Sequence, residues 1–202
     1  YHLTRIGITD VELLERQQLT CGTTWHAAGL VGQLRATRNL TELAKYTADL
    51  YHSLEAETGQ ATGFKQNGSI SVAKTLARLE ELKRGASMGK TFGLRIDELT
   101  PGEIKERWPL LEVGDVVGGI FLPGDGQTNP IDTTQALARG ARQRGAKILE
   151  NTRVQRIRVE KGRAVGVETA SGYIAADTVV LCAGMWSHRI AADVNVAVPL
   201  HA

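Results

Sequence analysis

The chain has 202 residues, of which 42% are hydrophobic and 23% charged, and its formal net charge at pH 7 is +2. This composition is typical of a globular protein with one large domain or two small ones. A charge so close to zero gives no argument for nucleic acid or an anionic membrane as partner. No apolar run approaches the roughly 20 residues that cross a bilayer. We therefore expect neither a nucleic-acid nor a membrane partner.

The first predicted elements are a helix end and a strand. Residues 1–7 indicate the last turn of a helix, with Gly7 as its C-cap. The apolar run Val11–Glu15 is expected to form a short, buried parallel strand. Its final acid, Glu15, can accept hydrogen bonds from the two hydroxyls of a ribose, although by spacing alone Glu15 equally well just ends a buried strand. A dinucleotide fold places this acid about 20 residues after a G-x-G-x-x-G turn. No such turn occurs here, so we expect an internal fragment.

The next segment sets a histidine among small residues. Thr23–Leu30 reads Thr-Thr-Trp-His-Ala-Ala-Gly-Leu. The small residues and Gly29 let the backbone approach a flat ligand closely, and His26 adds a reactive imidazole. Taken alone, a histidine beside Trp25 is more often a hydrogen-bonded, half-buried residue than a reactive centre. Trp25 itself is expected either to stack near a ligand or to fill a core beneath the loop.

Helices and strands alternate through the middle of the chain. A capping-box pattern at Asn39–Glu42 predicts a long amphipathic helix through Glu57, ended by Gly59. Asn67–Gly68 predicts a hairpin within the strand-like run 64–73. The Asp125–Gly126 loop is expected either to line a substrate cavity or to be a solvent turn. The other elements predicted here are helices over 76–88 and from Thr100-Pro101 to 107, and a strand over 116–122.

The last third reads as a helix followed by a meander. Asp132 is expected to cap a helix that runs to Arg144, with Gly145 as its stop. Cys182 lies in an apolar run and is expected to pack as a small hydrophobe. The two cysteines form no metal-ligand pattern, so no metal site is predicted. Strands are expected over 147–149, 154–160, 163–169, 173–175 and 178–181, and a helix over 185–192.

These elements predict a mixed α/β fold. Residues 1–35 and 132–202 are expected to form one discontinuous, incomplete Rossmann-like nucleotide-binding domain, truncated at both ends. Residues 36–131 are expected to supply helices and an inserted substrate-domain sheet.

In this order, the segments resemble the FAD-dependent amine dehydrogenases of the sarcosine and dimethylglycine dehydrogenase family, within the D-amino-acid-oxidase-like flavoproteins. The resemblance covers nearly the whole chain. Its specific element is the Thr-Trp-His-Ala-Ala-Gly-Leu run that ends at Leu30. Further matching motifs are Gln66–Ile70, Pro123–Gly126 and Val180–Trp186. The resemblance implies that the nucleotide-binding domain holds FAD.

The resemblance also assigns site residues. Glu15 matches the acid that binds the adenosine ribose, and Val154 the residue whose backbone meets the adenine. His26 matches the histidine that several members bond covalently to the flavin 8α-methyl carbon, although noncovalent FAD is the alternative. Trp186 matches a contact beside the flavin. No catalytic residue is assigned within this chain. The full set implied for FAD binding is Glu15, Arg16, Gly22, Thr23, Thr24, Trp25, His26, Ala27, Ala28, Gly29, Leu30, Val154, Gly184 and Trp186.

The activity implied by the resemblance is oxidative N-demethylation of a small, sarcosine-like N-methyl amino acid. A hydride would leave the N-methyl carbon for flavin N5, and the electrons would pass to an electron-transfer flavoprotein or another acceptor. Tetrahydrofolate would bind a C-terminal region that the family carries beyond this chain. The alternatives are a noncatalytic regulatory or scaffold subunit of the same fold and an oxidase of another secondary amine. A bacterial cytoplasm is the first expectation for the compartment, and a mitochondrial matrix the second.

Overall fold

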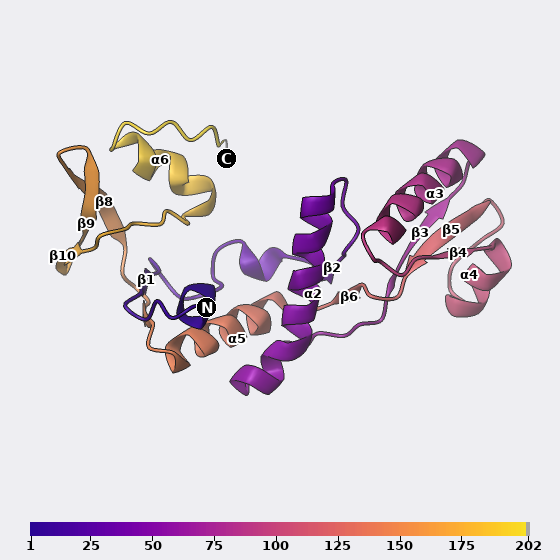
Figure 1. Ribbon diagram of the computed structural model, residues 1–202, viewed down its shortest axis with the longest axis horizontal. Helices are drawn as coiled ribbons and strands as arrows, with labels where there is room; N and C mark the ends of the chain where they lie inside the picture. The colour runs from indigo at the N-terminus through magenta and orange to yellow at the C-terminus, as the bar shows by residue number, and fades with distance from the viewer. Residues whose placement is uncertain (201–202) are drawn as a thin grey trace. The chain divides into compact units, whose positions relative to one another are not determined.

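The computed structural model describes residues 1–200 as a mixture of helices and strands, which confirms the predicted mixed α/β class (Figure 1). It contains two compact units, Tyr1–Gly22 with Ala141–Ala202, and Thr23–Gly140. Residues 201 and 202, the last two of the predicted nucleotide-binding domain, lie outside the described residues. The boundaries of the units differ from the predicted boundaries at 35 and 132, and the assignment of domain functions remains a prediction.

The first unit contains a short parallel sheet. After α1 (His2–Arg5), β1 (Glu12–Leu14) pairs in parallel with β7 (Lys147–Leu149). Both strands and the parallel direction of the first were predicted, whereas their pairing was not. The expected burial is wrong, because Leu13 remains 44% exposed. A two-stranded sheet offers few neighbours to cover its strands.

An antiparallel meander follows the parallel sheet. Strands β8 (Val154–Glu160), β9 (Arg163–Thr169) and β10 (Gly172–Ala175) pair in chain order. Lys161 and Gly162 both have positive φ, 49° and 78°, as a tight two-residue hairpin turn requires. The predicted meander is thus confirmed. The chain continues into a 3₁₀ turn, η2 (Gly184–Trp186), and α6 (Ser187–Ala192).

The strand expected over 178–181 does not form. Val180 is 69% exposed, and Cys182 is exposed rather than packed as a small hydrophobe. The physical reason is pairing, because a strand is stabilised by hydrogen bonds to a neighbour. Among residues 1–200, no strand pairs with this apolar segment.

The second unit begins with a 3₁₀ turn, η1 (Thr24–His26), and β2 (Leu30–Val31), which pairs antiparallel with β6 (Gly126–Gln127). The long helix α2 (Arg38–Thr58) is present and ends at Gly59, whose φ is 70°. Its predicted cap is wrong. Thr37, not Asn39, accepts the N–H of Leu40, because only a residue outside the first turn has the extended conformation that a cap needs.

The last helix of this unit is α5 (Pro130–Gln143), which runs across the boundary between the units. The Asn129 side chain accepts the N–H groups of Ile131 and Asp132. The predicted cap at Asp132 is therefore three residues too late.

A three-stranded antiparallel sheet forms the core of the second unit. The strands are β3 (Ser69–Ala73), β5 (Gly118–Leu122) and β4 (Asp97–Leu99), in the order β3-β5-β4. Successive side chains alternate between faces, so Ile120 and Leu122 pack on one face and Phe121 on the other. The first face meets α3 (Leu76–Thr91) and the second meets α4 (Pro101–Arg107) (Figure 1).

Two local predictions in this sheet have opposite outcomes. The predicted start of α4 is confirmed, since Thr100 and Glu103 form a reciprocal capping box. The predicted hairpin at Asn67–Gly68 is wrong, because β3 pairs with β5 and not with the preceding residues. Gly68 has φ of 77°, and a Cβ there would lie 2.2 Å from the ring of Phe121. The glycine therefore allows a close approach to Phe121 and does not turn a hairpin.

Candidate cofactor site

In the first unit, Glu15 stands directly after β1. Its N–H donates to the carbonyl of Leu149 at 2.9 Å, which extends the parallel pairing by one residue. One carboxylate oxygen, Oε1, accepts the N–H of Gln17 at 3.0 Å. A carboxylate has about four acceptor sites, so Glu15 can still accept a pair of hydroxyls. The carboxyl end of a parallel strand is also where ligands of open α/β sheets bind.

Arg16 and Trp186 lie together, although they are far apart in the sequence. The guanidinium carbon of Arg16 is 4.7 Å from the centroid of the Trp186 ring, within the range of a cation–π contact. Gly184, with φ of 55°, opens the 3₁₀ turn that carries Trp186. The structure therefore brings two of the predicted cofactor residues into contact next to Glu15, a contact that no local pattern reveals.

The segment that leads to Val154 also runs beside Glu15. The N–H of Thr152 donates to the Glu15 carbonyl at 2.8 Å, and the N–H of Asn151 donates to the Gln17 carbonyl. Val154 itself is half-buried at the start of β8. Gly22 is exposed, and a Cβ there would meet nothing within 4 Å, so no steric need for glycine is visible at that position.

In the second unit, the predicted segment Thr23–Leu30 is open to solvent. The rings of Trp25 and His26 lie 3.7 Å apart between centroids, with 32° between their planes. Trp25 is 56% exposed, which excludes the alternative in which it fills the core of this unit. His26 is exposed rather than half-buried. The pair thus presents a flat aromatic surface with an accessible imidazole.

The end of the segment explains its glycine. Gly29 has φ of 75°, and a Cβ at this position would lie 2.1 Å from the carbonyl oxygen of Thr128. The N–H of Thr128 in turn donates to the Gly29 carbonyl at 2.8 Å. No side chain fits between these two backbones, so glycine is required both by conformation and by space.

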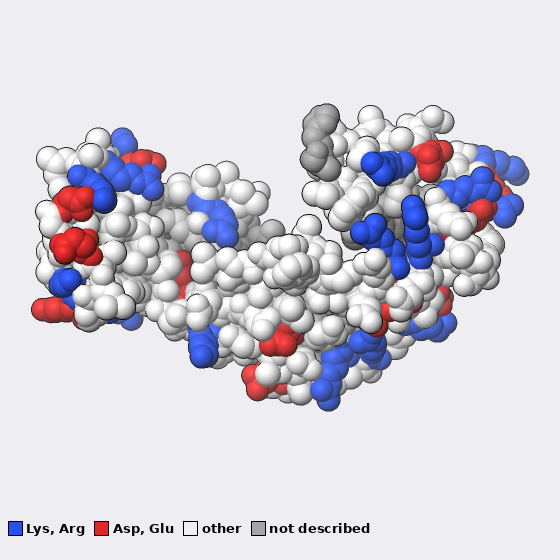
Figure 2. Space-filling view, turned by 180° about the vertical axis from the view of Figure 1, so that it is seen from behind, with Lys and Arg blue, Asp and Glu red and all other residues white. Residues whose placement is uncertain are grey.

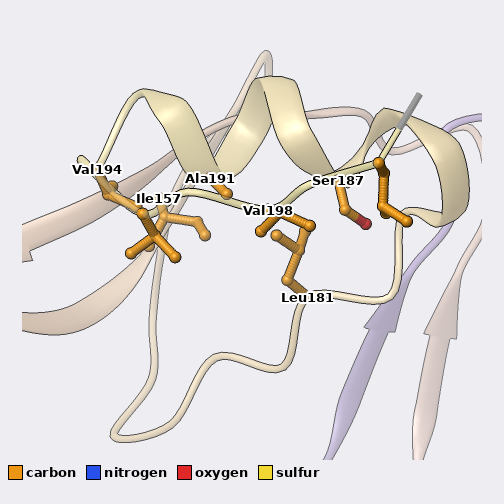
Figure 3. Close-up of a pocket in the computed structure, with 8 residues that line it drawn as sticks. Ile157, Leu181, Ser187, Ala191, Val194 and Val198 are labelled. Carbon is orange, nitrogen blue, oxygen red and sulfur yellow. The ribbon is translucent and has the colours of Figure 1, made fainter. Parts of the chain in front are cut away.

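A cavity of about 450 Å³ lies in the first unit. The side chains labelled in Figure 3 surround it from β8, α6 and the segments on either side of α6. Ser187 is the one polar residue among those that line it. An apolar lining offers no group that binds a phosphate or a carboxylate, so we do not assign the cofactor site to this cavity.

A further cavity, of about 270 Å³, lies in the second unit beside β2 and α2. It is lined by apolar side chains together with Arg35, Thr47 and Tyr51. Burial raises the pKa of the Tyr51 phenol above 10.0, so this hydroxyl stays protonated at neutral pH and can donate a hydrogen bond. Arg35 is the one cation among the lining residues, and its Nη1 donates to the carbonyl of Leu34 at 3.1 Å. Arg38 does not line the cavity and forms an exposed ion pair with Glu42 at 2.7 Å.

The sequence did not predict the burial of Asp125. Asp125 was expected to line a cavity or to sit in a solvent turn, but it is only 4% exposed and accepts two hydrogen bonds.

Among the described residues, no group of three or more His, Cys, Asp or Glu side chains could hold a metal ion. Positive and negative side chains are interspersed on the face drawn in Figure 2. No helix within residues 1–200 is long and apolar enough to span a membrane.

Comparison with known proteins identifies the class. The family model described as FAD dependent oxidoreductase matches residues 1–202, so the chain belongs to this family. Human mitochondrial sarcosine dehydrogenase is 43% identical over 99% of this chain and 22% of that protein. The 4-methylaminobutanoate oxidase (formaldehyde-forming) of Paenarthrobacter nicotinovorans is 42% identical over 100% of this chain and 24% of that protein. The predicted resemblance to the sarcosine dehydrogenase group is thus confirmed.

A relative of a different kind is also similar. The mitochondrial pyruvate dehydrogenase phosphatase regulatory subunit of Mus musculus is 38% identical over 100% of this chain and 23% of that protein. The chain therefore spans between 22% and 24% of the length of these three curated relatives.

Solved structures agree with the fold. Glycine oxidase from Bacillus cereus has a TM-score of 0.80 and 28% identity, over 95% of this chain and 53% of that one. L-proline dehydrogenase from P. horikoshii has a TM-score of 0.88 and 27% identity, over 96% of this chain and 51% of that one.

Taken unit by unit, the side chains present are of the kinds that FAD needs. In the first unit, Glu15 retains acceptor capacity at the carboxyl end of a parallel strand, and Arg16 and Trp186 join a cation to an aromatic ring. In the second unit, Trp25 and His26 expose two neighbouring aromatic rings, tilted by 32°. A nucleotide with ribose hydroxyls, phosphates and a flat ring system requires these kinds of groups.

Proposed function

We propose that this chain is part of an FAD-dependent oxidoreductase that demethylates a small N-methyl amino acid such as sarcosine. The observation that carries the proposal is the Thr23–Leu30 segment, which exposes His26 against Trp25 in a chain 43% identical to a sarcosine dehydrogenase. Bound FAD would supply the chemistry by accepting a hydride from the N-methyl carbon of the substrate.

The chain's own residues have distinct roles in this proposal. The Glu15 carboxylate accepts hydrogen bonds from the adenosine ribose, and Arg16 with Trp186 lies beside the nucleotide. The backbone around Val154 meets the adenine. His26 is the point of covalent attachment, through a ring nitrogen to the flavin 8α-methyl carbon. Residues 22–30 run along the pyrophosphate and the flavin.

The carboxylate of an amino-acid substrate needs a cation. Arg35 is the cation that lines the cavity beside β2, directly after the proposed flavin segment. An arginine binds a carboxylate with two parallel hydrogen bonds. We therefore propose Arg35 as the substrate's anchor, and an electron-transfer flavoprotein or a similar acceptor as the destination of the electrons.

One alternative has a specific observation in its favour. The 38% identity to a phosphatase regulatory subunit supports a noncatalytic role for the same fold. An oxidase of a longer methylamino acid is a second alternative, supported by the 42% identity to 4-methylaminobutanoate oxidase.

A panel of secondary and tertiary amines on the intact protein tests the proposal. We expect reduction of an artificial acceptor with sarcosine, weaker reduction with dimethylglycine or 4-methylaminobutanoate, and formaldehyde as product. Flavin absorbance that stays with the acid-precipitated protein would support covalent FAD. Preference for 4-methylaminobutanoate would instead favour the longer substrate. An intact protein without flavin and without turnover of any amine would refute the enzymatic proposal and favour the regulatory role.

A further inference from the structure

Asp125 is a buried carboxylate in the turn between β5 and β6. It is 4% exposed. Its Oδ1 accepts the backbone N–H of Gln33 at 2.8 Å, and its Oδ2 accepts the hydroxyl of Ser69 at 2.6 Å. Burial of a carboxylate is costly unless hydrogen bonds replace its water, so Asp125 strongly favours the arrangement in which both donors stay in place.

Gln33 ends a stretch of backbone, residues 29–33, that we call the anchor stretch. The anchor stretch begins at Gly29, whose carbonyl accepts the N–H of Thr128. It continues as β2, which pairs with β6. The hydrogen bond from the Gln33 N–H to Asp125 is the last of the hydrogen bonds that join the anchor stretch to residues 125–128. The whole anchor stretch therefore lies along residues 125–128.

The same aspartate joins the anchor stretch to the central sheet of the second unit. Ser69 is the first residue of β3, and the Asp125 carbonyl accepts the N–H of Gly68 at 2.8 Å. At Gly126, a Cβ would lie 2.3 Å from the carbonyl oxygen of Lys65, so the backbones here are in direct contact. Asp125 thus connects three segments that are distant in the sequence.

The segment just before the anchor stretch is held by short-range bonds. The N–H of His26 donates to Thr23 and that of Ala27 to Thr24, at 3.2 and 3.1 Å. Such bonds shape a turn but do not position it relative to a sheet. The position of His26 in this unit is therefore determined largely by the anchor stretch that follows it.

We propose that Asp125 is a positioning residue for the flavin-binding segment. It acts through the backbone N–H of Gln33 and does not itself touch the cofactor. The proposal rests on the proposed function for the identity of the ligand, but the claim that Asp125 holds residues 24–33 in place is independent of that ligand.

Hydrogen–deuterium exchange on the intact protein tests the proposal. In Asp125→Ala, amides of peptides covering 24–34 should exchange about tenfold faster, while those of α3 should not change. The fraction of flavin retained after acid precipitation should fall as well. Asp125→Asn keeps an oxygen that can accept the Gln33 N–H, and should restore slow exchange. The matched control is Asp115→Ala, which removes an exposed acid of the same unit paired with Lys74.

The outcomes separate the two proposals. Unchanged exchange over 24–34 in a folded Asp125→Ala protein would overturn the positioning role. If that variant does not fold, Gln33→Pro decides instead, because proline lacks the N–H that Asp125 Oδ1 accepts. Faster exchange over residues 24–32 in this variant supports the role, and no change overturns it. An intact protein without flavin would refute the flavin assignment, while the exchange comparison would still test Asp125.

Discussion

In the proposed function, the chemistry of the Thr23–Leu30 segment depends on two side chains, Trp25 and His26. The centroids of the two rings lie 3.7 Å apart, with 32° between the ring planes, and both residues are exposed. An exposed histidine is free to react with a ligand, whereas a buried one is usually occupied by hydrogen bonds. The two residues that follow, Ala27 and Ala28, are small and exposed as well.

At the residue scale, we predict that His26→Ala abolishes the covalent attachment of flavin in the intact protein. The imidazole is the proposed linking group, and alanine has no nucleophile. Mass spectrometry of the denatured variant should show the mass of the polypeptide without a flavin adduct. The exposed His52 on α2 provides the matched control. His52→Ala should keep the adduct, and an adduct of unchanged yield in His26→Ala would contradict the assignment.

The elements of the second unit depend on close contacts at glycines. Gly68 passes directly beneath the ring of Phe121, and Gly29 passes beneath the Thr128 carbonyl. Each position needs a positive φ and has no room for a Cβ. The contact at Gly68 positions the start of β3 against β5, and the contact at Gly29 positions β2 against β6.

At the element scale, we predict that Gly68→Ala destabilises the β3-β5-β4 sheet by roughly 2–4 kcal/mol, because left-handed strain and overpacking add. Urea unfolding of the intact protein should show an earlier midpoint, with an unchanged slope. Gly102→Ala is the control, since a Cβ there meets nothing within 4 Å. Its effect should stay within about 0.5 kcal/mol. Equal midpoints for the two variants would contradict the prediction, because they would mean that the Phe121 ring moves aside for the new Cβ at no cost in stability.

Across the whole molecule, exposed ion pairs lower the pKa values of several carboxyls. The Arg156 side chain hydrogen-bonds to Glu168 and holds its pKa below 4.5, and Lys74 holds that of Asp115 below 3.8. The pKa of Glu81 is lowered beside Arg78. A carboxyl with a lowered pKa in the folded state binds protons more weakly than in the unfolded state. Its contribution to stability is therefore present above the ordinary pKa and lost as pH falls through the lowered one.

At the scale of the molecule, we predict that stability decreases as pH falls from about 5 to about 3. The urea midpoint of the intact protein should move to lower concentration over this range, and salt should weaken the dependence because the pairs are exposed. Glu168→Gln should make the urea midpoint depend less steeply on pH, because it removes one of the carboxyls with a lowered pKa. A midpoint that rises on acidification would show that these pairs do not favour the folded state.

The sequence by itself determined the short-range features and the family. The helix start at Thr100-Pro101, the stop at Gly59 and the turn at Lys161–Gly162 each depend on hydrogen bonds and backbone conformations within a few residues. The family resemblance of Thr23–Leu30 similarly rests on consecutive residues. For these features, neighbouring residues suffice.

Only the tertiary structure decided which segments pair and which polar groups are buried. The apolar run 178–181 reads as a strand but has no strand beside it among the described residues. Asn67–Gly68 reads as a hairpin but leads β3 to a partner about 50 residues further along the chain. Asp125 reads as a loop acid but is buried against Gln33 and Ser69. Pairing and burial depend on partners that the local sequence does not contain, which is why they become visible only in the folded chain.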